Sequence, residues 1–203
     1  KKSLQLAGTQ LFEMIYPEVI PFYIDGKNWL SSVEQMIKVL SKGNVTWNDI
    51  LNLSDPKIIN RVKHLFRNLW KSIDEKGRFL RIPEQETLNE VYTEYDELVA
   101  NEDSIRLLDL YEKLVKPPFG ANTTAATLIV FYYLSTRSLE FDFVRIDATI
   151  TLLDLLAIKG SLNKYKAFNP NIWNQVFIRK AIRDDAKWVM LINRWSDETE
   201  YEK

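Results

Sequence analysis

Cysteine is absent from this 203-residue chain, and histidine occurs only once, as His64. The lack of cysteine excludes disulfide bonds, thiolate metal sites and cysteine nucleophiles, and it fits the reducing cytoplasm, where we place the protein. A single histidine excludes a histidine-rich metal site and any serine–histidine hydrolase built on another histidine. We therefore predict a cytoplasmic protein with no metal site and no cofactor.

The chain also has no large excess of positive or negative residues and no apolar run long enough to cross a membrane. The chain holds 27 Lys and Arg against 28 Asp and Glu, so its surface as a whole is not built for polyanions, and only a local patch could bind them. The longest apolar run, residues 125–134, is about half of the ~20 residues that cross a bilayer. No membrane partner is expected.

Glycine and proline are scarce, with 6 and 7 residues, and they concentrate between segments whose apolar residues recur at helical spacing. This distribution is typical of helical proteins. Start signals support five such segments, near residues 31–43, 46–53, 54–74, 84–101 and 121–134. The candidate capping residues are Thr46 with Asp49, Ser54 or Asp55 before Pro56, and Asn122 or Thr123.

Strand signals are few. Phe141 and Phe143 alternate with charged residues, so residues 139–147 could form a short strand or hairpin arm, and residues 149–151 could start a strand or a helix. Asn169 and Pro170 indicate a final helical stretch that includes Trp173, Trp188 and Trp195, with a kink or a division into two helices expected at Arg183-Asp184-Asp185. The predicted fold class is therefore mainly α, a multi-helix orthogonal bundle with at most one short strand pair or hairpin. We expect a single helical domain over residues 1–203.

Residues 116–134, KPPFGANTTAATLIVFYYL, combine a glycine with a polar turn and raise the question of a phosphate-binding loop. Such a loop needs several glycines and a lysine followed by Ser or Thr. This segment has no such lysine, and Gly26-Lys27 is followed by Asn28. The segment instead predicts a helix stop at Pro117-Pro118, a turn at Gly120 and a capped entry into a buried helix.

The strongest lead toward a binding function is a basic helix face. Five Lys and Arg residues fall between positions 57 and 71 with no acid among them, and three of them are spaced four residues apart. Such a stripe could meet nucleic-acid phosphates. The alternative is that the acidic residues between 84 and 103 balance it in a surface ion network. The candidate nucleic-acid residues are Lys57, Arg61, Lys63, Arg67 and Lys71.

No catalytic set stands out. His64 lies among these cations with no carboxylate within a turn to orient it, which indicates a surface histidine. Adjacent acids such as Asp184-Asp185 point in different directions on a helix, so they do not predict a hydrolase or a Mg²⁺ site. We predict that the chain has no catalytic residues, and an enzyme that uses acids with a metal stays the least favoured alternative. At least four of the six tryptophans are expected in the core.

Several segments, taken in order, resemble the helical region that follows the nucleotide-binding core in very large prokaryotic P-loop ATPases of the phage-exclusion type. The matching residues are Tyr16-Pro17, Trp70 and Pro117-Pro118-Phe119-Gly120. The resemblance covers about two-thirds of the chain, and Ala121 stands where a charged residue usually follows the turn. It implies an accessory helical domain beside an ATPase core and carries over no catalytic residue.

The chain starts without methionine and ends in DETEYEK, so we interpret it as a fragment of a larger multidomain bacterial protein. The predicted function is that of a non-catalytic accessory or interaction domain. Its partners would be other domains of the parent chain or another protein. The alternative function is binding of DNA or RNA through the basic helix face.

Overall fold

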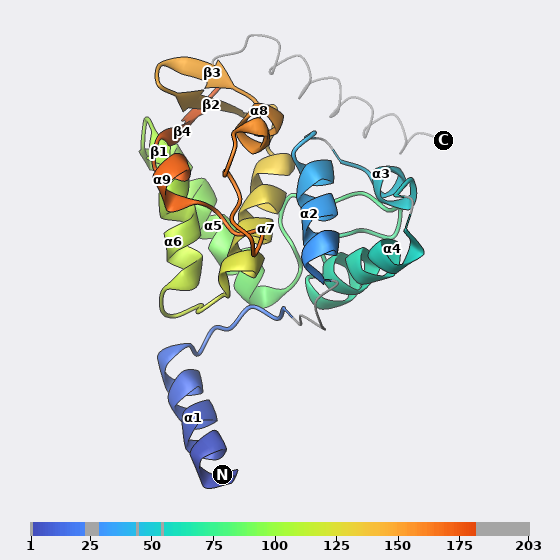
Figure 1. The fold of residues 1–203 in the computed structure, drawn as a ribbon, viewed down its shortest axis with the longest axis vertical. Coiled ribbons are helices and arrows are strands. Elements are labelled where there is room, and N and C mark those ends of the chain that lie inside the picture. Colours follow the sequence, from blue (N-terminus) through green and yellow to red (C-terminus); the bar gives the residue numbers. More distant parts are fainter. Residues whose placement is uncertain (1, 23–28, 44, 54, 182–203) are drawn as a thin grey trace, which may run out of the picture.

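The computed structural model describes residues 2–22, 29–43, 45–53 and 55–181 (Figure 1). Helices form most of the body, and a small antiparallel sheet closes one end of it. The helices are α1 Lys2–Ile15, α2 Trp29–Leu40, α3 Trp47–Leu51, α4 Pro56–Val62, the π-helix η1 Lys63–Leu69, α5 Glu86–Asn101, α6 Leu107–Val115, α7 Thr123–Ser135, α8 Leu152–Ala157 and α9 Pro170–Trp173. The strands are β1 Ile105–Arg106, β2 Phe141–Arg145, β3 Ala148–Ile150 and β4 Val176–Lys180.

Helix α7 is the centre of the core, with α2 packed on one side and α6 on the other (Figure 1). All of its residues from Thr124 onward are buried. A helix that is apolar on every side is stable in water only when other elements surround it. The prediction of a buried helix after Gly120 is therefore confirmed, and the side chain of Asn122 caps it by accepting from the Ala125 amide at 2.9 Å.

The other predicted caps also form. Thr46 and Asp49 make the reciprocal capping box at the start of α3, with the Thr46 amide donating to Asp49 at 2.8 Å. Asp55 accepts from the Lys57 amide at 2.8 Å at the start of α4. These local signals were readable because a short polar side chain reaches the free amides of the first helical turn without help from the rest of the fold.

The fold class predicted from the sequence is wrong, because the four strands form one antiparallel sheet in the order β1-β4-β2-β3. The chain is a mixed helix and sheet fold. The Phe141 and Phe143 segment is a strand, as its alternation suggested, and β3 begins before the predicted position and gives way to α8. The sequence analysis suggested β2 but missed the strand that pairs with it along its whole length. That strand is β4, which follows α9.

The segment after Asn169 is predicted to be helical throughout, but the helix lasts only one turn. It gives way to β4, in which Val176 and Ile178 are buried while Arg179 and Lys180 are exposed. Ile178 lies opposite Phe143 of β2 and opposite Ile105 of β1. Burial of these facing side chains outweighs the weak local helix signal. Trp188, Trp195 and Asp184-Asp185 lie outside the described residues.

The long helix expected over residues 54–74 is α4 followed by η1, where the hydrogen bonds lengthen to a π-helical pattern. The Trp70 amide donates to the Leu65 carbonyl, five residues back, at 2.9 Å; beyond the helix, the Ser72 amide donates to the Phe66 carbonyl at 2.7 Å. The helix ends at Leu69, and the chain turns away at Lys71, whose φ is +47°. Phe66 and Trp70 are fully buried and pack edge to face on each other, which holds this segment on the core.

Helix α1 stands apart from the body. In Figure 1 it extends away from the other elements, joined through residues that run along the base of the body. Two described contacts tie this connection to the turn before α7: Gly120 faces Tyr16, and the Glu18 amide donates to the Pro118 carbonyl at 3.3 Å. The arrangement leaves residues 6–14 of α1 exposed to solvent.

Candidate interaction surfaces

The five basic residues predicted to form one helix face are divided by the fold. Arg61 faces α2, where its guanidinium donates to Ser32 at 2.8 Å and lies 5.7 Å from the ring centre of Trp29. Lys63 and Arg67 are exposed on η1. Lys57 is exposed at the opposite end of this segment, and Lys71 is exposed beyond the end of the helix.

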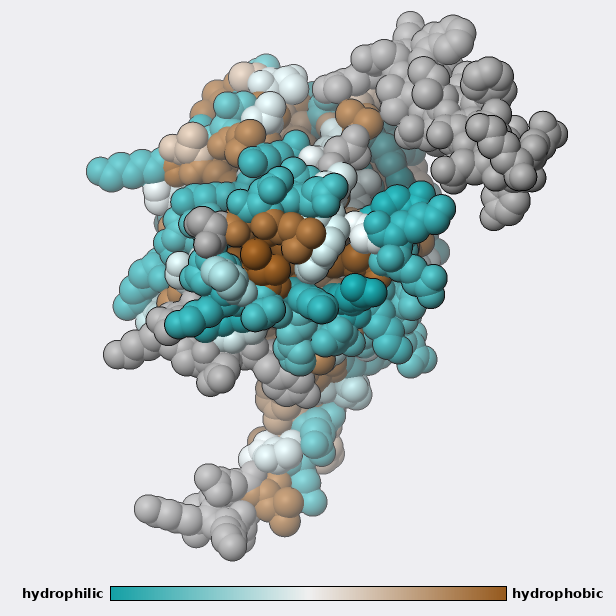
Figure 2. Space-filling model, turned by 90° about the vertical axis from the view of Figure 1, so that its right-hand side faces the viewer, coloured by the Kyte–Doolittle hydropathy of each residue, from teal (hydrophilic) through white to brown (hydrophobic). Residues whose placement is uncertain are grey.

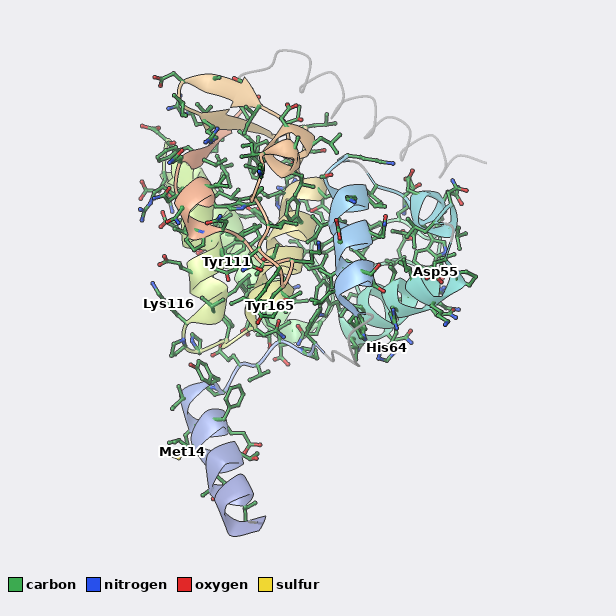
Figure 3. All side chains as sticks on the ribbon, viewed as in Figure 1. Met14, Asp55, His64, Tyr111, Lys116 and Tyr165 are labelled. Atoms are coloured by element: carbon green, nitrogen blue, oxygen red, sulfur yellow. The ribbon has the colours of Figure 1, made fainter. Side chains whose placement is uncertain are left out.

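Lys63 and Arg67 are exposed on η1, and Lys71 is exposed in the turn that follows it; we call these three residues the η1 surface. His64 is exposed beside them and lies at the lower edge of the body in Figure 3. The longer turn of a π-helix keeps residues four apart near each other, so Lys63 and Arg67 stay neighbours. Lys57, at the start of α4, and Arg61, which faces α2, lie outside this surface.

The described ion pairs of the acidic helix α5 are made with other parts of the molecule. Glu94 pairs with Lys113 of α6. Asp96 binds Arg137, just beyond α7, at 2.6 Å and lies 3.9 Å from Arg81. These contacts show that Glu94 and Asp96 face α6 and the end of α7, which is a different arrangement from the two-helix ion network considered from the sequence.

The Arg137–Asp96 pair is the most buried charged contact that the structure describes, and the sequence analysis missed it. The Arg137 side chain is fully buried, donates two hydrogen bonds to Asp96 at 2.6 and 2.7 Å, and lies 4.1 Å from the ring centre of Tyr133. The Tyr133 hydroxyl also donates to Asp96 at 2.9 Å. Nothing in the sequence linked Asp96 to Arg137, because Asp96 is on α5 and Arg137 follows 41 residues later, just beyond α7.

Electrostatics keep this pair charged. Burial by itself would raise the pKa of Asp96, but the hydrogen bonds and charge of Arg137 outweigh it and hold the pKa below its usual value. Burial raises the pKa of Tyr133 far above its usual value, so its hydroxyl stays a donor. With its oxygens already bonded, Asp96 joins α5 to α7 and offers no free base for catalysis. Within the described ranges, no three His, Asp or Glu side chains gather as metal ligands.

Among the residues that the structure describes, helix α1 carries a cluster of exposed apolar side chains. Met14 is 80% exposed, Leu11 58% and Leu6 62%. Figure 3 shows Met14 well clear of the body, and Figure 2 shows brown, hydrophobic atoms on the helix where it stands below the body. Phe12 packs on Tyr16, with ring centres 4.8 Å apart. In the part of the chain that the structure describes, no helix is long and apolar enough to cross a membrane.

Comparisons of the chain with protein-family models, with curated proteins and with solved structures found no match. The case for each candidate surface therefore depends only on the residues that form it. Two of them suit a macromolecular partner: the apolar helix α1, which no other described element covers on its exposed side, and the basic η1 surface.

Proposed function

We propose that this chain is a non-catalytic interaction domain that binds a protein partner through α1. The observation that carries the proposal is the exposure of Leu11, Met14 and Ile15 on a helix that extends from the body. An isolated helix of 14 residues is only marginally stable in water. Contact with a partner would bury these side chains and stabilise the helix.

The pattern of α1 indicates the chemistry of the partner. Ala7, Leu11, Met14 and Ile15 recur at intervals of three and four, so they share one face. No charged residue occurs from position 3 to position 12. A broad, uncharged apolar face fits an apolar groove in a folded protein, in the manner of other helix-in-groove complexes. Two such helices packed alone would bury less surface than stable dimers need, which disfavours a second copy as the partner.

The experiment uses α1 variants in the full-length protein. A photocrosslinking residue at position 14 is expected to give one dominant protein adduct, identified by mass spectrometry. Leu11→Asp should abolish this adduct, because a charge would enter the groove. Leu6→Asp is the matched control, since Leu6 is equally exposed and projects from the opposite side of the helix.

Equal loss or equal retention of the adduct in Leu11→Asp and Leu6→Asp would contradict a face-specific contact. A crosslink to another copy of the same chain would show that the partner is the chain itself and not a foreign groove. Both outcomes are separable from misfolding, because the unfolding of the body can be measured in each variant.

We further propose that the domain works in the cytoplasm beside an ATPase core, as the resemblance implies. The contact of Tyr16 with Gly120 and the hydrogen bond from Trp70 to the Pro21 carbonyl, at 2.9 Å, support treating the matching segments as one structural unit. A phosphate-binding loop in the sequence that precedes this domain in its parent protein would support this context. If no such loop precedes the domain, the reason for placing it beside an ATPase core is removed.

Nucleic-acid binding by the η1 surface is the second candidate function. The observation in its favour is that the described ion pairs of α5 are satisfied by Lys113, Arg137 and Arg81, so these acids do not neutralise Lys63, Arg67 and Lys71. Fluorescence anisotropy at low salt should show binding of DNA or RNA whose affinity falls with salt. Changing the three residues to Glu should abolish it. Lys63→Glu alone should weaken it, whereas Lys116→Glu, a single charge reversal of an exposed lysine outside this surface, should not. No binding by the unmodified chain at low salt would eliminate this candidate.

A further inference from the structure

A polar hollow lies between the second half of α2 and the loop that follows α8. Its volume is about 260 Å³, and both charged and aliphatic side chains line it. This size is near the lower end of small-molecule sites. The hollow is distant in sequence from both interaction surfaces described above and shares no residue with them.

Three lysines surround the hollow against one acid. Lys38 of α2 lines it, together with Lys159 and Lys166 from the loop. Glu34 lies between two of them, 3.2 Å from Lys38 and 2.7 Å from Lys166. The hydrogen bond from Lys166 is the main influence that lowers the pKa of Glu34. The lining therefore carries an excess of two positive charges near neutral pH.

Ser161 adds a hydroxyl group that the described structure leaves without a partner. The residue is 1% exposed and lines the hollow, and its Oγ makes no hydrogen bond with any described residue. A buried polar group without a partner is costly. The backbone of Ser161 is held firmly, because its carbonyl accepts from the Trp173 indole at 2.6 Å and from the Asn169 amide at 3.1 Å.

The loop presents Lys166 in a constrained turn. Lys166 has a φ of +57°, which is uncommon for a residue other than glycine. The Asn163 side chain accepts from the Tyr165 amide at 2.8 Å, and the Tyr165 carbonyl accepts from Thr124 of α7 at 2.8 Å. These bonds join the loop to the core and fix the position from which Lys166 reaches the hollow.

We propose that this hollow binds the phosphate group of a small molecule. Ammonium groups and a hydroxyl are the donors that a tetrahedral anion accepts from, and the positive excess compensates a dianion. The aliphatic side chains of Leu156, Ile158 and Leu162 border the same hollow and would contact an apolar part of the ligand. The ligand class is thus a phosphate monoester with an apolar group.

Inorganic phosphate and phenyl phosphate are the probes. Thermal unfolding is measured with each probe at about 10 mM and with chloride at the same ionic strength, because a ligand selective for the native state raises the midpoint. Both probes should raise the midpoint above chloride, and phenyl phosphate should bind more tightly. Equal affinities would overturn the apolar part of the proposal, and no rise with either probe would overturn it entirely.

Variants locate the site. Lys38→Gln should weaken the affinity for phenyl phosphate about tenfold, the loss expected for one charge-assisted hydrogen bond, and Ser161→Ala should weaken it without destabilising the protein. Glu34→Gln should strengthen it, because the competing carboxylate is removed. Lys116→Gln, an exposed lysine that pairs with Glu112 elsewhere, should leave it unchanged. Equal affinities in all four variants would place the binding elsewhere and overturn the assignment.

Discussion

The ring of Tyr16 lies against the α-carbon of Gly120 and occupies the space that a side chain at position 120 would need. Gly120 also has a φ of +56°, in the left-handed region that glycine tolerates best. This contact joins the segment after α1 to the turn that begins α7. It brings together two segments that are about 100 residues apart in sequence, Tyr16-Pro17 and the Pro-Pro-Phe-Gly turn.

We expect Gly120→Ala to lower the free energy of unfolding by about 1–2 kcal/mol or more, because it adds the cost of the left-handed conformation to a collision with Tyr16. Tyr16→Ala makes room for the new methyl group. In a double-mutant cycle measured by urea unfolding, the two changes together should therefore cost less than their sum. Strict additivity would show that the two residues do not press on each other.

Asp96→Asn should destabilise the fold by about 3–5 kcal/mol at neutral pH, since it leaves the fully buried guanidinium of Arg137 without its counter-charge. The folded pKa of Asp96 lies below its unfolded value. Its contribution to stability is therefore present above about pH 4 and is lost as the pH falls through the folded pKa.

The difference in unfolding free energy between wild-type and Asp96→Asn should consequently shrink as the pH is lowered from about 5 toward about 2. Urea unfolding at a series of pH values measures this. Asp109→Asn is the control, because the pair of Asp109 with Arg106 is exposed and should contribute less than about 1 kcal/mol. A cost for Asp96→Asn that does not change with pH would argue against an ionised pair.

Asn122→Ala removes the cap of α7 and should cost about 1 kcal/mol, because the Ala125 amide loses its acceptor. Asn122→Ser restores a capping oxygen and should recover most of the loss. Thermal unfolding of the three proteins is sufficient to test this. A serine variant as unstable as the alanine variant would mean that Asn122 acts through something other than its cap.

Ile178→Ala should cost about 2–5 kcal/mol, since the side chain is buried between β1 and β2. The neighbouring change Arg179→Ala removes an exposed side chain and should stay within about 0.5 kcal/mol. This contrast follows from the alternating burial of a strand. If the two substitutions cost the same, β4 would not be the paired strand that the structure shows.

Leu11→Asp should leave the unfolding free energy of the body unchanged within about 0.5 kcal/mol, because Leu11 is mostly exposed and contacts none of the core. This result would separate the loss of a binding surface from the loss of the fold. A clear drop in stability would show that α1 packs on the body in solution.

The sequence by itself determined the local features of this protein. The caps at Thr46, Asp55 and Asn122, the stop before Gly120 and the burial of α7 were all predictable, because each depends on residues within one turn or on a continuous apolar run. The absence of cysteine and the single histidine also limit the chemistry that the chain can perform, whatever its fold.

The tertiary structure decided which strands pair with each other and which distant side chains come into contact. β2 was suggested by its alternation, but its pairing with β4 depends on the burial of Phe143 against Ile178, which no local pattern reports. The Arg137–Asp96 pair, the turning of Arg61 toward α2 and the lysines around the hollow likewise join residues that are far apart in sequence. Local propensity specifies single elements, whereas long-range burial selects their partners, and only the folded chain contains that information.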